Sequence, residues 1–235
     1  MKTWYNNVDK RIISDDNTIV GFTKGINCMK FDGIIFDLDG TMWNSTEGVC
    51  ATWNQVLEGY PEITCRITAD MLYATMGLPM DEIGRRLFPD CDAKKQAELL
   101  KKCGDLENEY LSKHGGILYP DLEKTLAKLS EKYKLFVVSN CQNGYIESFF
   151  EAHGTGKYFT DIECFENTGL SKGENNKLVI ERNGLKNAVY VGDTQGDADS
   201  AAVAGIPFIY ASYGFGNVEK YDYSIKKFSE LLDIL

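Results

Sequence analysis

The amino-acid sequence predicts an α/β fold in which a doubly wound parallel sheet carries an inserted, all-helical cap domain. From Lys134 onward, short apolar runs alternate with helical patterns, and such alternation requires right-handed crossovers between parallel strands. Between residues 47 and 119 the apolar residues instead recur at intervals of three and four, as in helices that bury one face. The chain of 235 residues is long enough for a core domain with a smaller insert.

Residues 1–30 precede the first strand of this predicted core. Within them, residues 11–22 resemble a β-hairpin, because two short strand-like runs are joined by acidic and amide turn residues. We therefore expect three regions: an N-terminal extension of residues 1–30, a core made of residues 31–46 and 120–235, and a helical cap of residues 47–119.

The first core strand is predicted at residues 34–36, a short apolar run that is followed directly by Asp37 and Asp39. Residues i and i+2 of an extended chain point to the same side, so both carboxylates can face one ligand beyond the end of the strand. Two converging acids suit a hard cation and a phosphoryl group.

The insert is predicted as a series of short helices followed by a longer one. Residues 92–113 carry mixed charge and are typical of a helix with a solvated face. Breaks at residues 77–79 and at Pro89 separate the shorter helices. The apolar stripes that mark them are Val49, Trp53, Val56 and Leu57 in the first, and Met80, Ile83 and Leu87 in the second.

Further strands are expected in the second half of the chain, which gives the sheet at least four strands. In such sheets, ligands bind outside the carboxyl ends of the strands, so Asp37, Ser139 and Asp193 are expected on one rim. The predicted strands are residues 135–138, 188–191 and 206–210, and the helical patterns between them are residues 145–152, 177–182 and 198–204.

The composition excludes several classes of partner. Lys and Arg number 25 against 35 Asp and Glu, and a net charge of −10 repels nucleic acids and anionic membranes. No apolar run approaches the roughly 20 residues that a membrane-spanning helix needs, and residues 1–11 lack the apolar segment of a signal peptide. We therefore expect a soluble, cytoplasmic monomer or homodimer that binds neither nucleic acid nor membrane.

The cysteines and histidines further restrict the chemistry. Seven cysteines, an odd number with no Cys-x-x-Cys spacing, argue against a disulfide framework and against a zinc knuckle. Because the sequence contains only two histidines, we expect carboxylates to perform any acid–base chemistry.

Polar residues follow the strand of residues 135–138. Ser139 and Asn140 precede a helix whose free amides can hold an anion, although such pairs are also common turn or capping residues. Lys172 lies in an otherwise polar loop, from which its ammonium could reach the same rim or remain in solvent.

Acids also follow the strand of residues 188–191. Asp193 could bind a cation, and Asp197 could brace loop amides or the ligands of the metal. The alternative is that these aspartates simply cap a helix.

In order along the chain, the motifs are Asp-x-Asp-Gly-Thr, a strand followed by Ser-Asn, a lysine, and Gly-Asp-x-x-x-Asp. This set resembles the haloacid dehalogenase-like (HAD) superfamily of phosphohydrolases over residues 31 to about 215. The spacing is similar to members with a helical cap after the first motif, and residues 205–216 resemble phosphoglycolate-phosphatase-like enzymes. The resemblance implies a Rossmann-like core, Mg²⁺ as cofactor and a small phosphorylated metabolite as substrate.

The resemblance also implies a role for each matching residue. Asp37 would be the nucleophile that forms an aspartyl-phosphate, and Asp39 the acid that protonates the leaving alcohol and then activates water. Asp37, the backbone carbonyl of Asp39, and Asp193 would hold Mg²⁺. Asp197 would support these ligands. The substrate would be contacted by Thr41, Ser139, Asn140 and Lys172.

Two positions depart from the pattern of the resembled family. Relatives usually have Lys-Pro at the third motif, whereas Lys172 is followed by Gly173. Relatives also usually carry Asp where Asn44 stands, a change that bears on a helix cap or on a contact behind the metal ligands. Neither departure removes an expected metal ligand.

Substrate choice is expected to lie in the cap, because a cap over the rim excludes water and contacts the leaving group. The turn at residues 77–79 and the arginines Arg85 and Arg86 are the candidates for this contact.

The sequence therefore favours a phosphatase of small phosphomonoesters, with two alternatives. In a sugar phosphomutase, Asp39 would help to return the phosphoryl group to the sugar instead of to water. A phosphate-binding regulator without turnover is disfavoured by the intact set of acids. Dehalogenation is disfavoured too, because attack on carbon does not need the second acid, Asp39.

Overall fold

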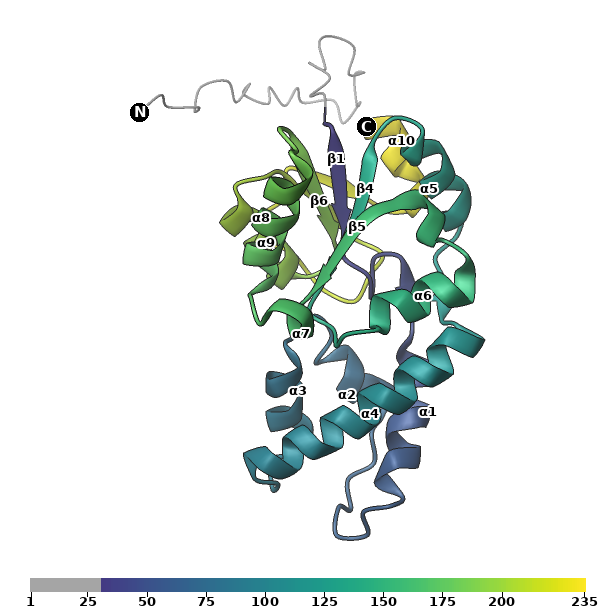
Figure 1. Ribbon diagram of the computed structural model, residues 1–235, viewed down its shortest axis with the longest axis vertical. Coiled ribbons are helices and arrows are strands. Elements are labelled where there is room, and N and C mark those ends of the chain that lie inside the picture. Colours follow the sequence, from purple (N-terminus) through teal and green to yellow (C-terminus); the bar gives the residue numbers. More distant parts are fainter. Residues whose placement is uncertain (1–30) are drawn as a thin grey trace, which may run out of the picture.

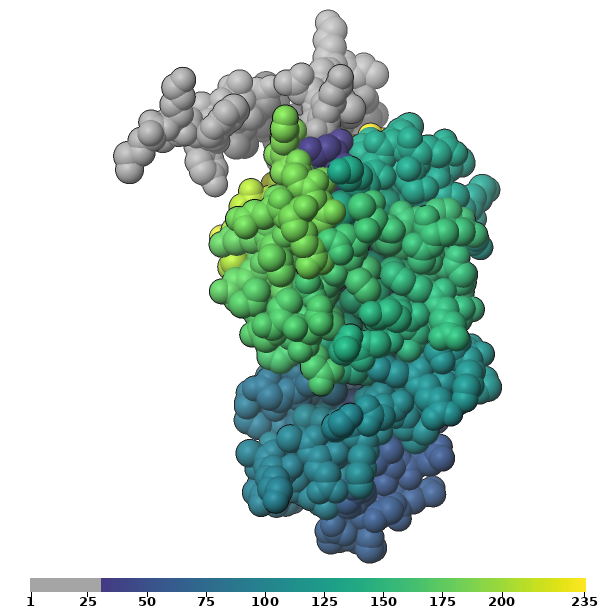
Figure 2. Space-filling model, in the orientation of Figure 1, coloured from purple at the N-terminus to yellow at the C-terminus, as the bar shows by residue number. Residues whose placement is uncertain are grey.

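The computed structural model describes residues 31–235, so the hairpin expected within residues 1–30 lies outside the described residues. The described chain forms two lobes, a sheet flanked by helices and a smaller helical cap beneath it (Figure 1). The space-filling view shows the two lobes in contact, with the cap in blue and teal below the green core (Figure 2). No helix of the described residues is both long and apolar enough to span a membrane.

The core lobe contains a six-stranded sheet in the order β5-β4-β1-β6-β7-β8, in which every neighbouring pair is parallel. The α/β fold predicted from the sequence is therefore confirmed. The strands are β1 (Gly33–Phe36), β4 (Lys134–Ser139), β5 (Phe159–Cys164), β6 (Ala188–Gly192), β7 (Phe208–Ala211) and β8 (Tyr223–Ile225).

Strands β5 and β8 are additions to the four that the sequence predicted. Both lie at the edges of the sheet, and β5 contains the polar residues Thr160, Asp161 and Glu163 among its apolar ones. An edge strand is partly solvated and need not form the continuous apolar run that identifies a central strand.

Alternate residues of the central strands build two separate apolar layers. Ile35, Phe136 and Tyr190 face the helices α8 (Lys172–Asn183) and α9 (Gln195–Ala204). On each strand the neighbouring residues face the other side of the sheet, as Ile34 and Phe36 do on either side of Ile35. That second layer is covered by α5 (Leu122–Ser130), α6 (Tyr145–His153), the 3₁₀ turns η1 (Gly156–Tyr158) and η2 (Phe228–Glu230), and α10 (Leu231–Ile234). Both faces of the sheet are therefore buried, as parallel strands require.

The cap consists of four helices between two short strands. The helices are α1 (Thr46–Leu57), α2 (Ala69–Tyr73), α3 (Met80–Leu87) and α4 (Ala93–His114). Strands β2 (Trp43–Asn44) and β3 (Ile117–Leu118) pair in antiparallel fashion, so the chain enters and leaves the cap at one place. Strand β3 lies within the segment expected to be entirely helical, because two residues are too few to produce a recognisable periodicity.

The cap packs on the core through a continuous apolar cluster. The ring of Trp43 is fully buried, and its centroid lies 5.1 Å from that of Phe149 and 5.7 Å from that of Tyr145, both on α6. A polar contact joins the lobes on the other side of the cap, where Asn140 Nδ2 donates to Gly77 O over 2.8 Å. The turn at Gly77 therefore lies over the end of β4.

Candidate active site

Asp37 and Lys172 form a buried ion pair at the carboxyl end of β1. The Asp37 amide donates to Val191 O over 2.8 Å, which fixes the carboxylate beside β6. Lys172 Nζ lies 2.9 Å from Asp37 Oδ1 and 2.8 Å from Asp197 Oδ1. The lysine is not in a loop as expected, because it is the first residue of α8, directly after the capping residue Ser171. The helix start therefore aims this ammonium into the site.

Burial and charge act in opposite directions on this pair. Burial alone would lower the pKa of Lys172, but the carboxylates of Asp197 and Asp37 raise it above its usual value. Burial, together with the negative charge of Asp197, raises the pKa of Asp37, while Lys172 opposes that rise. Lys172 is therefore a permanent cation, and Asp37 lies in a place that is crowded with negative charge.

Asp193 follows β6 and is fully buried. Its Oδ1 accepts a hydrogen bond from Thr41 Oγ1 over 3.2 Å, and its Oδ2 accepts one from the Phe215 amide over 2.7 Å. Thr41, expected at the substrate, thus contacts the Asp193 carboxylate in this structure. Burial and the neighbouring acids Asp197 and Asp37 raise the pKa of Asp193.

Two glycines leave room for the Asp193 carboxylate. Gly40 has φ of +80°, and a Cβ there would lie 2.2 Å from Asp193 Oδ2. A Cβ at Gly214 would lie 2.3 Å from Asp193 Cβ. The glycine of the first motif is therefore required both by its backbone conformation and by the close approach of Asp193.

Asp197 braces the site with both of its oxygens. Its Oδ2 accepts from the Asp193 amide over 3.1 Å, and also from the amide and hydroxyl of Thr194 over 2.9 Å and 2.7 Å. Its Oδ1 accepts from Lys172. Thr194 is the N-cap of α9 and Asp197 completes the capping box, so the capping alternative and the bracing role describe the same contacts.

Asp39 points toward the cap side of the site. Its Oδ1 accepts from Ser45 Oγ over 2.7 Å and from the Tyr145 hydroxyl over 2.9 Å. Burial raises the pKa of Asp39, and these two hydrogen bonds oppose that rise. Neither Ser45 nor Tyr145 could be singled out from the sequence, because a serine near a helix start and a tyrosine in a helix are ordinary residues.

The geometry fits a divalent cation. Carboxylate oxygens of Asp37, Asp193 and Asp197 lie within 4.8 Å of one another. These three buried acids lie beside the ammonium of Lys172, so the acids outnumber the cation and a divalent ion would balance them when they are ionised. Because both oxygens of Asp197 already accept hydrogen bonds, Asp37 and Asp193 are the carboxylates best placed to hold an ion such as Mg²⁺.

A small cavity of about 60 Å³ lies between this site and the cap. The core contributes Asp37, Asp39 and Ser139 to its walls, and Ser139 is 5% exposed. Asn140, Gly77 and Leu78 also line it, so part of the expected turn at residues 77–79 reaches the cavity. Asn44, where relatives carry Asp, retains a capping contact, because its Oδ1 accepts from the Thr46 amide over 3.0 Å.

Sequence reasoning missed one charged residue of this cavity, Glu107 on α4. Glu107 is only 4% exposed, and its Oε2 accepts a hydrogen bond from Trp53 Nε1 over 2.5 Å. In the sequence it lies within a run of mixed charge, where glutamates are usually solvated.

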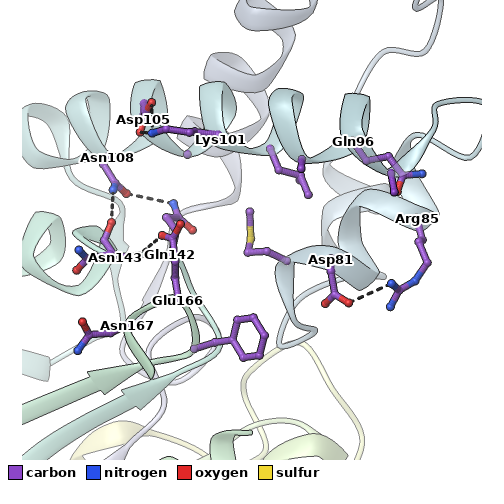
Figure 3. Close-up of a pocket in the computed structure, with 16 residues that line it drawn as sticks. Asp81, Arg85, Gln96, Lys101, Asp105, Asn108, Gln142, Asn143, Glu166 and Asn167 are labelled. Carbon is purple, nitrogen blue, oxygen red and sulfur yellow. Dashed lines mark hydrogen bonds and ion pairs between the residues drawn. The ribbon is translucent and has the colours of Figure 1, made fainter. Parts of the chain in front are cut away.

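A larger groove of about 700 Å³ lies outside this cavity, between α3 and α4 of the cap and α7 (Phe165–Thr168) of the core. Both spaces are lined by Met80 and Gln142, so the groove adjoins the cavity. Asn108 of α4 points across the groove toward the core, where its Nδ2 donates to Asn143 O over 2.8 Å and its Oδ1 accepts from Gln142 (Figure 3).

The cap arginines lie away from the acids. Arg85 lines the groove and pairs with Asp81 over 3.0 Å (Figure 3), and both Arg85 and Arg86 contact Glu82. Their side chains are 56% and 51% exposed, and neither lines the small cavity. The structure therefore does not bring these two expected substrate contacts together with Asp37.

Comparisons with known proteins agree with this fold. The family model described as haloacid dehalogenase-like hydrolase matches residues 34–211. Phosphoglycolate phosphatase of Escherichia coli K12 is 27% identical over 222 residues, covering 82% of this chain and 85% of its own.

Two solved structures superpose on the described chain. One is a haloacid dehalogenase-like hydrolase from Bacteroides fragilis, at 26% identity and a TM-score of 0.76, which covers 86% of this chain and all of its own. The other is described as a predicted phosphoglycolate phosphatase from Haemophilus somnus, at 25% identity and a TM-score of 0.73, with 87% and 98% of the two chains covered.

Proposed function

The chain belongs to the haloacid dehalogenase-like hydrolases, as its motifs predicted, and we propose that this phosphatase hydrolyses a small phosphomonoester through an aspartyl-phosphate at Asp37. The observation that carries the proposal is the meeting of Asp37, Lys172 and Asp193 at the buried end of the sheet, beneath the cap. The relatives named phosphoglycolate phosphatase support a small phosphorylated substrate.

In the first step, a carboxylate oxygen of Asp37 attacks phosphorus, and the bond between phosphorus and the alcohol oxygen breaks. Asp39 donates its proton to that departing oxygen. Burial favours the protonated form of Asp39 before the step, and Ser45 and Tyr145 hold its carboxyl group in place.

In the second step, Asp39 takes a proton from water, whose oxygen attacks phosphorus and releases inorganic phosphate and the Asp37 carboxylate. Lys172 and Ser139 stabilise the negative charge of the phosphoryl oxygens during both transfers. Asp37, Asp193 and the Asp39 carbonyl would hold Mg²⁺, which neutralises charge where an anionic carboxylate approaches an anionic phosphate.

The experiment is a panel of phosphomonoesters, incubated with the protein and Mg²⁺ and followed by release of free phosphate. The Asp37→Asn variant should lose at least about a thousandfold in turnover, because a nucleophile cannot be replaced by an amide. Protein quenched in acid during turnover should carry one labelled phosphoryl group in the wild type and none in the variant.

Three results would contradict the proposal. Activity retained in Asp37→Asn would exclude the covalent route. Conversion of a hexose 1-phosphate to its 6-phosphate without free phosphate would identify a mutase. Binding of phosphate without hydrolysis of any ester would identify a regulator.

A further inference from the structure

Glu107 is a buried acid that the proposed mechanism does not use. It extends from α4 of the cap into the same small cavity as Asp37 and Asp39. The indole of Trp53, on α1, fixes its orientation through the hydrogen bond to Oε2. Since the cap covers the side from which the alcohol departs, Glu107 is placed to meet the leaving group rather than the phosphoryl group.

The walls of the cavity contain acids and no cation among the described residues. Its charged side chains are Asp37, Asp39 and Glu107. The nearest ammonium, on Lys172, is already bonded to Asp37 and Asp197. A carboxylate on the leaving group would therefore find no Lys or Arg partner there.

The cations of the adjoining groove are also paired. Arg85 is bonded to Asp81, and Lys101 Nζ lies 2.9 Å from Asp105 Oδ2 (Figure 3). Neither Arg85 nor Lys101 reaches the cavity wall.

The pKa of Glu107 indicates that the cavity disfavours the charged form of a carboxyl group. Burial and the negative charge of Asp39 raise the pKa of Glu107 to about 8, although hydrogen bonds from Trp53 and Gln142 oppose the rise. A carboxylate carried in by a substrate would meet the same burial and the same charge. One neutral donor of the cavity, Trp53 Nε1, already donates to Glu107.

We propose that Glu107, in its ionised form, selects the leaving group, because it accepts a hydrogen bond from a hydroxyl or ammonium donor on the departing alcohol and disfavours alcohols that carry a carboxylate. This inference rests on the proposed phosphatase function and specifies its substrate class. It also separates this chain from what the name of its relatives implies, because glycolate carries a carboxylate.

Three two-carbon esters test the proposal, since they differ only in the group at the far carbon. They are phosphoglycolate with a carboxylate, 2-hydroxyethyl phosphate with a hydroxyl, and phosphoethanolamine with an ammonium. At about pH 9, where Glu107 is ionised, the wild-type kcat/KM should be at least about tenfold higher for the two donor-bearing esters, because a hydrogen bond to a charged group changes binding by about 10- to 100-fold. The comparison of 2-hydroxyethyl phosphate with phosphoethanolamine distinguishes a preference for a hydroxyl from a preference for an ammonium group.

At the same pH, the Glu107→Gln variant should reduce that preference at least about tenfold, since it removes the charge of the ionised carboxylate and keeps the size of the side chain. Glu109→Gln is the matched control, because Glu109 lies on the same helix, is exposed and pairs with Lys113. The control should leave the preference unchanged.

The outcomes separate the two proposals. Turnover with a wild-type preference for phosphoglycolate, or an equal shift in both variants, would overturn the role of Glu107 while leaving the phosphatase intact. Absence of turnover on every ester would instead overturn the proposed function. If Glu107→Gln does not fold, the wild-type order of the three esters decides.

Discussion

The carboxylates at the sheet end differ in the number of contacts that hold them. Asp197 is bonded to Lys172, Thr194 and the Asp193 amide through both of its oxygens, whereas the hydrogen bonds from Ser45 and Tyr145 reach Asp39 at Oδ1. The braced acid has no oxygen free for chemistry. The less restrained acid retains the second oxygen for proton transfer, in line with the roles that we propose.

Gly40 offers a sharp test of the geometry around Asp193. In Gly40→Ala, the added Cβ meets Asp193 Oδ2 at 2.2 Å, and the residue must also hold φ of +80°. We expect phosphatase activity to fall at least about a hundredfold, because displacement of a metal ligand by about 1 Å disrupts a positioned site. Steady-state kinetics with saturating Mg²⁺ measure the effect.

Gly184→Ala is the control for the backbone strain alone. Gly184 has φ of +63° at the end of α8, and nothing lies within 4 Å of an added Cβ. Both variants should lose about 1–2 kcal/mol of unfolding free energy from the left-handed conformation. Only Gly40→Ala should lose activity, and equal activity in the two would refute the clash with Asp193.

At the scale of single residues, the sequence identified the acids better than their partners. Asp37, Asp39 and Asp193 could be predicted because they follow strands at a common rim. Glu107 and Tyr145 could not, because their place beside the cavity depends on which way a helix faces after folding, and a helical pattern does not record what lies opposite.

At the scale of elements, helix α8 explains one departure from the family pattern. A Cβ at Gly173 would lie 2.7 Å from Val203 Cβ and 3.1 Å from Ser200 O on α9. The glycine therefore permits α8 and α9 to pack closely, and that packing positions Lys172 at the site. A proline at Gly173 would meet the same neighbours.

Gly173→Ala should therefore lower the unfolding free energy by about 1–3 kcal/mol, the usual cost of overpacking. Val203 is 51% exposed, and Val203→Gly removes both the Cβ and the Cγ1 that the added Cβ would meet, at a cost of about 1 kcal/mol for a glycine within α9. A double-mutant cycle by chemical denaturation measures the coupling. Additive effects of the two substitutions would show that Val203 does not limit the space at Gly173.

Central strands were easier to predict than edge strands for a physical reason. Strands β1, β4, β6 and β7 each have an apolar run because both of their faces are covered. Strand β5 is half exposed and polar, and β8 has only three residues. Strand β3, at the end of the cap, was also missed, because a strand of two residues is too short to give a recognisable apolar run.

At the scale of the whole molecule, the buried acids oppose folding unless a cation is bound. Saturating Mg²⁺ at a hundred times its Kd should stabilise the wild type by about 2.7 kcal/mol, because only the folded chain assembles the site. Thermal unfolding with Mg²⁺ and with EDTA measures this shift.

The Asp193→Asn variant is compared with the wild type in the same thermal unfolding experiment. The substitution removes one of the acids that raise each other's pKa, so the variant should unfold at a higher temperature than the wild type in EDTA. It should also gain little from Mg²⁺. A wild-type midpoint that does not respond to Mg²⁺ would contradict the assignment of the metal ligands.

The β2–β3 ribbon has a consequence for how such proteins diversify. Trp43 pairs with Leu118 and Asn44 with Ile117, so the points of departure and return are adjacent in space. Residues 45–116, which lie between the two strands, therefore form an insertion whose two ends are adjacent. With the roles proposed above, a graft of residues 45–116 into a related scaffold would leave Asp37 and Lys172 in place while it replaced Glu107, so the reacting groups and the choice of leaving group would be inherited separately.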